Sequence, residues 1–170
     1  MFQYIKLLNK QDPDGLTKSN LLGWHSQYFD LENEKPRYFV NSISASLNHV
    51  FSDMGWNIKD QEVKITSMWA IINKKHASNT SHIHSNNYIS AVYYVKAPKN
   101  CGNIIFQDPR SVTSFRYPKI SKPNKLNSNV FIDQPKEGFL VLFPSYLYHS
   151  VELNKSNQER IVISFNIDLI

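Results

Sequence analysis

Residues 160–167 read Arg160-Ile161-Val162-Ile163-Ser164-Phe165-Asn166-Ile167, and this run decides the fold class. Strict alternation of side chains is typical of a β-strand, because successive residues point to opposite faces of a sheet. One face of the run is entirely apolar and consists of Ile161, Ile163, Phe165 and Ile167. The other face is mixed and consists of Arg160, Val162, Ser164 and Asn166. We therefore predict a strand that buries its first face in a core and presents its second face to a different environment.

Similar short runs, rich in β-branched and aromatic residues, occupy most of the chain from residue 63 onward. Turn sequences separate them, for example at 98–102, 134–138 and 154–157. The predicted strands are 63–73, 81–84, 88–96, 103–107, 129–133, 138–143, 149–153 and 160–168. Many short strands with turns between them favour an antiparallel sandwich or jelly roll. The predicted fold class is mainly β.

The first 60 residues have a different pattern. Apolar residues recur at three- and four-residue spacing after Lys35, and Gly55 is placed to end a helix there. Residues 1–35 read as an irregular wrapping segment with a turn at 12–15. We expect one or two helices in residues 1–60 that support a jelly-roll core in residues 61–170, all within a single domain.

Composition limits the class of protein. A chain of 170 residues with 41% hydrophobic and 19% charged residues is typical of one globular domain. The single cysteine, Cys101, excludes an internal disulfide and a cysteine-rich metal site. No apolar run exceeds the five residues 139–143, so we expect no membrane partner. The lysines that give the formal charge of +5 are scattered, which argues against a nucleic-acid partner. The expected location is the cytoplasm, and the sequence leaves a homodimer open.

Three histidines form the first candidate site. His82 and His84 are two residues apart, so an extended strand places both imidazoles on one face. His149 follows the apolar run 139–143, and in a jelly roll such distant strands face each other. Three imidazoles can occupy one face of an octahedral metal ion and leave three positions for other ligands. His25 and His76 lie in an irregular segment and a Lys-rich loop, and we assign them surface or structural roles.

Arg160 is the second candidate, because the mixed face of the last strand begins with it. The strand follows His149 closely in the sequence, so Arg160 can project into the same cavity as the histidines. A guanidinium binds a carboxylate through two parallel hydrogen bonds. The sequence thus predicts a metal and an anion anchor side by side.

These residues together resemble the iron(II)- and 2-oxoglutarate-dependent oxygenases, and more narrowly a group of them found in marine bacteria and their phages. The resemblance rests on motifs in this order: Ser19-Asn20, residues 23–26, Trp69 with Asn73, His82-Ile83-His84, residues 90–95 and 106–110, Phe143-Pro144-Ser145 with His149, and Arg160 with Ser164-Phe165-Asn166. It covers most of the chain. For a phage-encoded member, the expected location is the host cytoplasm.

The resemblance implies a double-stranded β-helix in which His82 and His149 bind Fe(II) and Arg160 binds the distal carboxylate of 2-oxoglutarate. Tyr94, Ser164 and Asn73 are the further candidates for holding the cosubstrate. With O2, such an enzyme hydroxylates a C–H bond and releases succinate and CO2. The substrate would be a protein side chain such as proline, or a small molecule.

The sequence departs from the broader superfamily at His84, where an Asp or Glu is usual. Three neutral imidazoles leave the metal with one more unit of net positive charge than two imidazoles and a carboxylate would. We expect His84 to be the third ligand. The alternative is that Asp108 or water completes the metal site.

Other functions stay open at this point. A cupin has a similar histidine pattern, but it would place a glutamate where Tyr88 stands and would leave Arg160 without a role. A non-catalytic β-sandwich binding module would make the histidines incidental. A nucleobase demethylase would be expected to carry a second arginine where Asn166 stands.

The long loop 109–128 is the expected substrate mouth. Loops of this length in small domains are more often functional than idle. It carries three lysines and two arginines, which would attract an acidic partner: Arg110, Arg116, Lys119, Lys122 and Lys125.

Overall fold

The last predicted strand is β10 (Arg160–Leu169), the central strand of a five-stranded sheet in the computed structural model. The structure describes residues 1–110, 118–124 and 127–170. Along this first sheet the strands run in the order β2 (Trp24–His25), β3 (Val63–Asn73), β10, β5 (Ile89–Lys96) and β8 (Leu140–Pro144). β10 pairs with β3 on one side and with β5 on the other.

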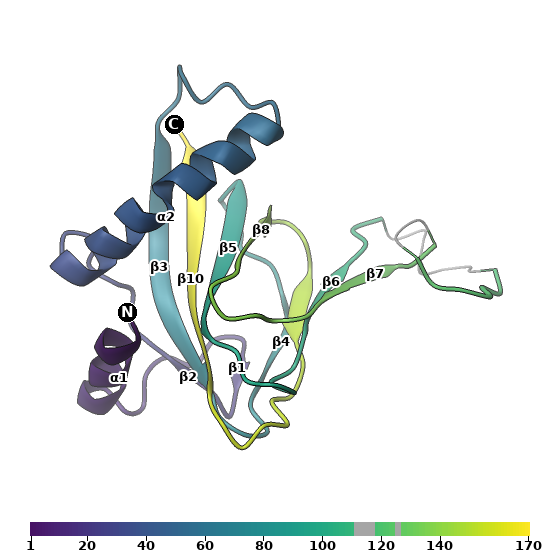
Figure 1. Cartoon of the computed structure of the whole chain (residues 1–170), viewed down its shortest axis with the longest axis horizontal. Coiled ribbons are helices and arrows are strands. Elements are labelled where there is room, and N and C mark those ends of the chain that lie inside the picture. The colour runs from purple at the N-terminus through teal and green to yellow at the C-terminus, as the bar shows by residue number, and fades with distance from the viewer. Residues whose placement is uncertain (111–117, 125–126) are drawn as a thin grey trace.

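A second five-stranded sheet faces the first. Its order is β1 (Asn20–Leu21), β4 (Ser78–His82), β9 (His149–Val151), β6 (Ile104–Gln107) and β7 (Val130–Asp133). All strand pairs among the described residues are antiparallel. Figure 1 shows the two sheets, with β6 and β7 extending away from the helices. The mainly β, jelly-roll prediction is confirmed.

Two helices cover the outer face of the first sheet. α2 (Glu34–Asp53) crosses β3 and β10, and α1 (Phe2–Gln11) lies near the N-terminal strands (Figure 1). The Asn33 side chain caps the start of α2 by accepting a hydrogen bond from the Lys35 N–H. Gly55, with a φ of 70°, follows its end. The prediction of a helix at 35–55 agrees with α2, whereas the prediction that residues 1–35 are irregular is wrong for α1.

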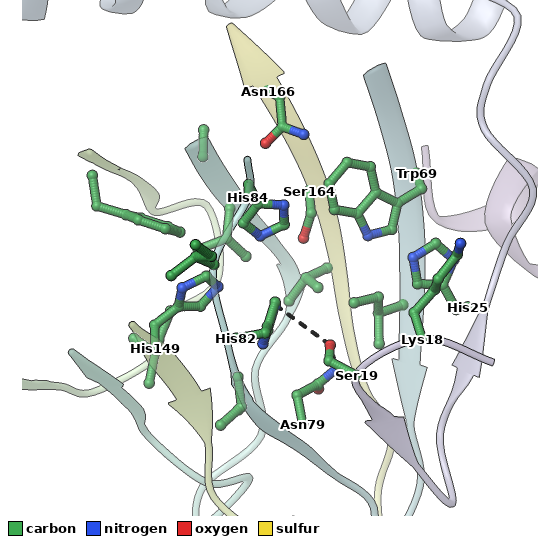
Figure 2. A pocket seen from close by; sticks show the side chains of 18 of the residues that line it. Lys18, Ser19, His25, Trp69, Asn79, His82, His84, His149, Ser164 and Asn166 are labelled. Atoms are coloured by element: carbon green, nitrogen blue, oxygen red, sulfur yellow. Dashed lines mark hydrogen bonds between the residues drawn. The ribbon is translucent and has the colours of Figure 1, made fainter. Parts of the chain in front are cut away.

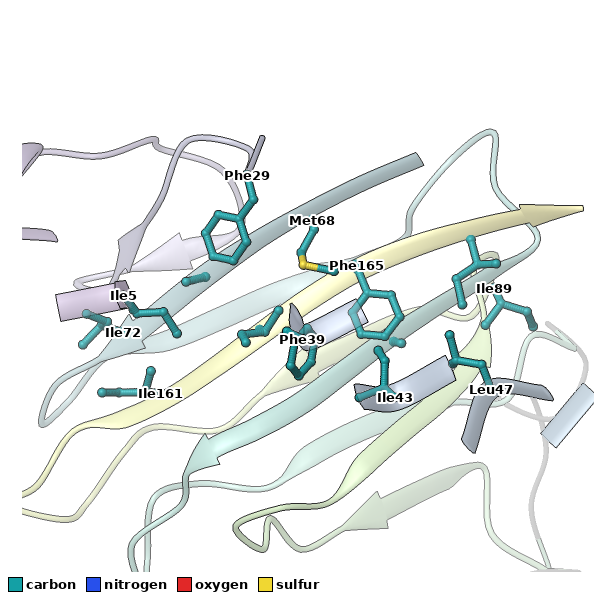
Figure 3. Close-up of a cluster of buried hydrophobic side chains, with 14 of the residues drawn as sticks. Ile5, Phe29, Phe39, Ile43, Leu47, Met68, Ile72, Ile89, Ile161 and Phe165 are labelled. Atoms are coloured by element: carbon teal, nitrogen blue, oxygen red, sulfur yellow. The ribbon is translucent and has the colours of Figure 1, made fainter. Parts of the chain in front are cut away.

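The main core lies between these helices and the first sheet, as Figure 3 shows. The apolar face of β10 is buried there against α2, as the alternation predicted. Fully or almost fully buried members of this core are Ile5, Phe39, Leu47, Phe51, Met68, Ile72, Ile161, Ile163, Phe165 and Ile167. At about 1.5–3 kcal/mol for each large side chain, this burial fixes the first sheet and therefore the direction of its other face.

The opposite face of the first sheet points toward the second sheet. A smaller apolar cluster lies there and contains Val92, Tyr94, Ile104, Phe106, Phe143 and Val162. A cavity opens beside this cluster. The mixed face of β10 thus lines the space between the sheets, where the candidate residues lie.

Most strands agree with the predicted runs, with one shift that matters. β4 spans Ser78–His82, so His84 lies beyond the end of the strand, contrary to the prediction of a strand at 81–84. The backbone N–H of His84 donates to the carbonyl of Ser145, which follows β8. His84 is therefore positioned by the first sheet, and His82 by the second.

Candidate active site

A cavity of about 460 Å³ lies between the two sheets and contains the three candidate histidines. His82 ends β4, His149 begins β9, and these two residues are direct partners across the antiparallel pair. The ring centroids of His82 and His149 are 4.2 Å apart, and the His84 ring is 5.2 Å from each of them. Figure 2 shows the three rings together at one side of the cavity.

The hydrogen bonds of two of these rings define which nitrogen is free. His82 Nδ1 donates to the Thr80 carbonyl over 2.7 Å, and His149 Nδ1 donates to the Leu147 carbonyl over 3.0 Å. Each Nε2 is therefore a lone-pair donor to a metal, an arrangement that fixes the tautomer. The Ser19 hydroxyl lies 3.4 Å from His82 Nε2.

Burial keeps all three rings neutral. Desolvation lowers the pKa of His84 to about 3 and that of His149 to about 4, and it also lowers the pKa of His82. A ligating imidazole must be deprotonated. Each ring can offer one nitrogen, and these nitrogens lie within 4.8 Å of one another. The donor set fits a metal ion that accepts imidazole, iron(II) included.

Asp108, the alternative third ligand, is engaged elsewhere. Its carboxylate accepts hydrogen bonds from Arg110 Nε and Nη2, and these bonds hold its pKa well below the usual value. It is not among the described residues that line the cavity, nor does it join the histidine group. The geometry therefore brings His84, and not Asp108, to His82 and His149.

Arg160 lies in the same cavity and is only 3% exposed. Its Nη1 donates to the carbonyls of Cys101 and Gly102, at 2.8 and 3.1 Å. No carboxylate forms an ion pair with it among the described residues. Desolvation lowers the pKa of this guanidinium, although it remains a cation. A buried cation without a counter-ion is costly, so this position suits an anionic ligand.

The further cosubstrate candidates fall into two groups. Tyr94 and Ser164 line the cavity, and burial raises the pKa of the Tyr94 hydroxyl so that it stays protonated. Asn73 does not line the cavity. It is fully buried behind the wall, and its Nδ2 donates to Asn79 Oδ1. Its own Oδ1 has no partner among the described residues.

His25 is the residue that sequence reasoning placed wrongly. It lines the cavity, is 4% exposed, and stacks on Trp69 with centroids 5.6 Å apart. Its segment pairs with β3 as β2, whereas we expected an irregular stretch. The sequence feature that could have indicated a role for His25 was its place in Gly23-Trp24-His25-Ser26, beside a large aromatic residue. His76, by contrast, does not line the cavity.

The predicted substrate mouth is only partly described. Residues 111–117 and 125–126 of the loop lie outside the described residues. None of its described residues lines the cavity.

Comparison with known proteins identifies the family. The family described as "Putative 2OG-Fe(II) oxygenase" matches residues 67–166, which include the three histidines and Arg160. The chain belongs to this family. This 2OG-Fe(II) oxygenase is a 2-oxoglutarate-dependent dioxygenase, and its histidine group and Arg160 suit the metal and the cosubstrate of the family name. No curated protein matches the chain.

Solved structures share the fold of this 2OG-Fe(II) oxygenase at low sequence identity. The carbocyclase SnoK from nogalamycin biosynthesis has a TM-score of 0.67 and 10% identity, over 98% of this chain and 72% of that one. A prolyl-4-hydroxylase from Pseudomonas putida has a TM-score of 0.59 and 12% identity, over 98% and 84%. The viral collagen prolyl hydroxylase of Paramecium Bursaria Chlorella virus-1 has a TM-score of 0.59 and 14% identity, over 98% and 87%.

No helix among the described residues is both long and apolar enough to cross a bilayer.

Proposed function

We propose that this oxygenase hydroxylates a C–H bond of a protein side chain, such as proline, or of a small molecule. The reaction consumes 2-oxoglutarate and O2 and yields the alcohol, succinate and CO2. When bound, iron(II) and 2-oxoglutarate supply the oxidising power for this step. The structural likeness to two prolyl hydroxylases supports a peptide substrate, and the likeness to SnoK supports a small molecule.

We assign the metal to His82, His84 and His149. Their contribution is to present three neutral nitrogens from two sheets, with two rings held by backbone carbonyls. Because the rings carry no charge, they would leave a bound metal ion its full positive charge, which would favour a dianionic cosubstrate.

We assign the distal carboxylate of 2-oxoglutarate to Arg160, with Tyr94 and Ser164 as hydrogen-bond donors beside it. The observation that carries the proposal is this pairing in one cavity of a neutral histidine group and a buried guanidinium without a counter-ion. An anion at Arg160 would supply the missing negative charge, and an anion that also ligates the metal would bridge both sites.

The test is an anaerobic titration of the purified protein with Fe(II) and then 2-oxoglutarate, followed by absorption spectroscopy. We expect a metal-to-ligand charge-transfer band in the wild type, no band in His149→Ala, and a band that needs at least tenfold more 2-oxoglutarate in Arg160→Met. Tight Fe(II) binding without a band in the wild type would overturn the cosubstrate assignment. Succinate production on addition of O2 is the second readout.

A further inference from the structure

The wall of the cavity beyond His84 is built from the N-terminal segment and β3. The ring centroids of Trp69 and His84 are 5.5 Å apart. Trp69 also stacks in parallel on His25, and Tyr28 packs edge-on against Trp69 with a centroid distance of 5.8 Å. Figure 2 shows His25, Trp69 and Lys18 on the side of the cavity opposite His149. These residues lie next to the histidine group but belong neither to it nor to the Arg160 anchor.

One buried donor and one ring acceptor in this wall have no partner among the described residues. Trp69 Nε1 has no hydrogen bond among the described residues, although the side chain is only 5% exposed. His25 Nδ1 donates to the Ser26 carbonyl over 2.7 Å, which leaves His25 Nε2 as a bare acceptor. Leaving a buried donor such as Trp69 Nε1 unsatisfied is costly, and binding sites are where such a cost is tolerated.

The charged side chains of the described residues that line the cavity are all cationic. Lys18 and Arg160 are its cationic residues, and none of its described lining residues is Asp or Glu. Lys18 forms no ion pair within the described part of the chain. Since the cosubstrate would use Arg160, the ammonium of the exposed Lys18 is left to attract a second anion at the edge of the cavity.

The volume of the cavity also limits the class of substrate. Ligand pockets commonly span about 300–1,000 Å³ for one ligand. This cavity has about 460 Å³, and the cosubstrate and the substrate would share it. The space that remains suits a small molecule better than a peptide segment.

We propose that the substrate is a small organic acid whose carboxylate pairs with Lys18, whose body packs on Trp69, and whose N–H or O–H group donates to His25 Nε2. This inference rests on the proposed function and names the substrate class for it. Trp69 and His25 then set specificity, because they touch substrate next to the metal. A proline within a peptide chain would lack the carboxylate that Lys18 requires.

The test uses the full chain with Fe(II) and 2-oxoglutarate under anaerobic conditions. The probes are the proteinogenic L-amino acids and their 2-hydroxy analogues, each paired with its carboxamide, and blocked proline peptides form a separate arm. Calorimetry gives the dissociation constants, and a change in the charge-transfer band reports binding near the metal. We expect at least one acid to bind at least tenfold more tightly than its carboxamide.

Variants test whether Lys18 and Trp69 cause the preference for acids. Lys18→Met should remove the preference for acid over carboxamide, whereas Lys18→Arg should keep it. Lys59→Met, an exposed lysine outside the cavity, is the matched control and should change nothing. Trp69→Phe keeps an aromatic ring but removes part of the indole surface on which the acid packs, and should weaken binding of the acid at least threefold.

The outcomes separate the two proposals. A charge-transfer band with no bound acid, or with equal binding of acids and carboxamides, overturns this inference alone. The same holds if Lys18→Met keeps the preference, or if only the blocked peptides bind. Absence of the band in the wild type overturns the proposed function, and this inference with it.

Discussion

His82 and His149 lie directly opposite each other on β4 and β9, and each donates its Nδ1 hydrogen to the backbone carbonyl two residues before it. The same local hydrogen bond thus appears twice, once on each strand. It turns both Nε2 atoms into acceptors at a point where their ring centroids are 4.2 Å apart. Two acceptors held so close favour a shared cation between them.

Removal of one of these rings should therefore weaken metal binding without unfolding the protein. We expect His149→Ala to weaken Fe(II) or Co(II) binding by about tenfold or more. Calorimetry with Co(II) under identical conditions measures the affinity, and circular dichroism confirms the fold. His49→Ala, which removes an exposed histidine on α2, is the control. Equal metal affinity in His149→Ala and the wild type would refute the metal site.

His84 offers a more selective test, because it stands where a carboxylate is usual in the superfamily that this sequence resembles. His84→Asp replaces a neutral ligand by an anionic one and lowers the net charge of the metal complex by one unit. We expect tighter binding of Fe(II), by about tenfold, and no such gain in His84→Asn. Weaker binding in His84→Asp than in His84→Asn would show that His84 is not a ligand.

Arg160 should matter for ligand binding more than for stability. Arg160→Met removes a buried charge that has no counter-ion, and this gain offsets the loss of its two bonds to carbonyls. We expect the free energy of unfolding of the ligand-free protein to change by less than about 2 kcal/mol, and 2-oxoglutarate binding to lose about 2–5 kcal/mol. Urea denaturation and calorimetry measure the two quantities. A large loss of stability with normal 2-oxoglutarate affinity would make Arg160 a structural residue.

Much of this architecture follows from local pattern. The alternation in β10 predicts both of its faces, because a strand has a side-chain period of two. The spacing of Phe39, Ile43 and Leu47 predicts α2 in the same way. Arg160 could be predicted to share the cavity with His149, because the alternation places Arg160 on the mixed face of β10 and because the two residues lie close together in the sequence.

Other features depend on contacts that no local pattern encodes. A second helix was allowed by the prediction, but its position in α1 was not predicted, and its residue Ile5 is buried through the core formed with the first sheet. Lys6 also pairs with Glu159, a residue from the other end of the chain. His25 reaches the cavity because β2 pairs with β3, a partner far along the chain. Non-local pairing of this kind decides whether a histidine is a surface residue or part of a site.

Acid should destabilise the metal-free protein through the buried histidines. The pKa of His84 is about 3 and that of His149 about 4 in the folded state, against an ordinary value of 6.5 when unfolded. Between these values the unfolded chain binds more protons, so stability falls as the pH drops below about 6.5 and is constant above it. Each ring contributes at most about 1.4 kcal/mol per pH unit to the change in the free energy of unfolding.

Urea denaturation of the metal-free protein at a series of pH values from 7.5 to about 5 measures this effect. A double variant, His84→Gln with His149→Gln, should make the pH dependence shallower, and His82, whose pKa burial also lowers, accounts for part of what is left. An equally steep dependence in the double variant would assign the effect to other groups.

Gly102 connects the fold to the Arg160 site, and its replacement should damage both. It has a φ of 87°, a backbone conformation that residues with a side chain rarely adopt. A Cβ at this position would also collide with the backbone carbonyl of Glu152. Because the Gly102 carbonyl accepts a hydrogen bond from Arg160, any shift of this turn moves the guanidinium.

We expect Gly102→Ala to lower the free energy of unfolding by more than about 1 kcal/mol and to weaken 2-oxoglutarate binding as well. Gly138→Ala is the matched control. Its φ of 80° imposes the same conformational strain, but a Cβ there meets nothing within 4 Å. It should cost stability without changing the affinity for 2-oxoglutarate. If both variants bind 2-oxoglutarate as the wild type does, the turn at Gly102 does not position Arg160.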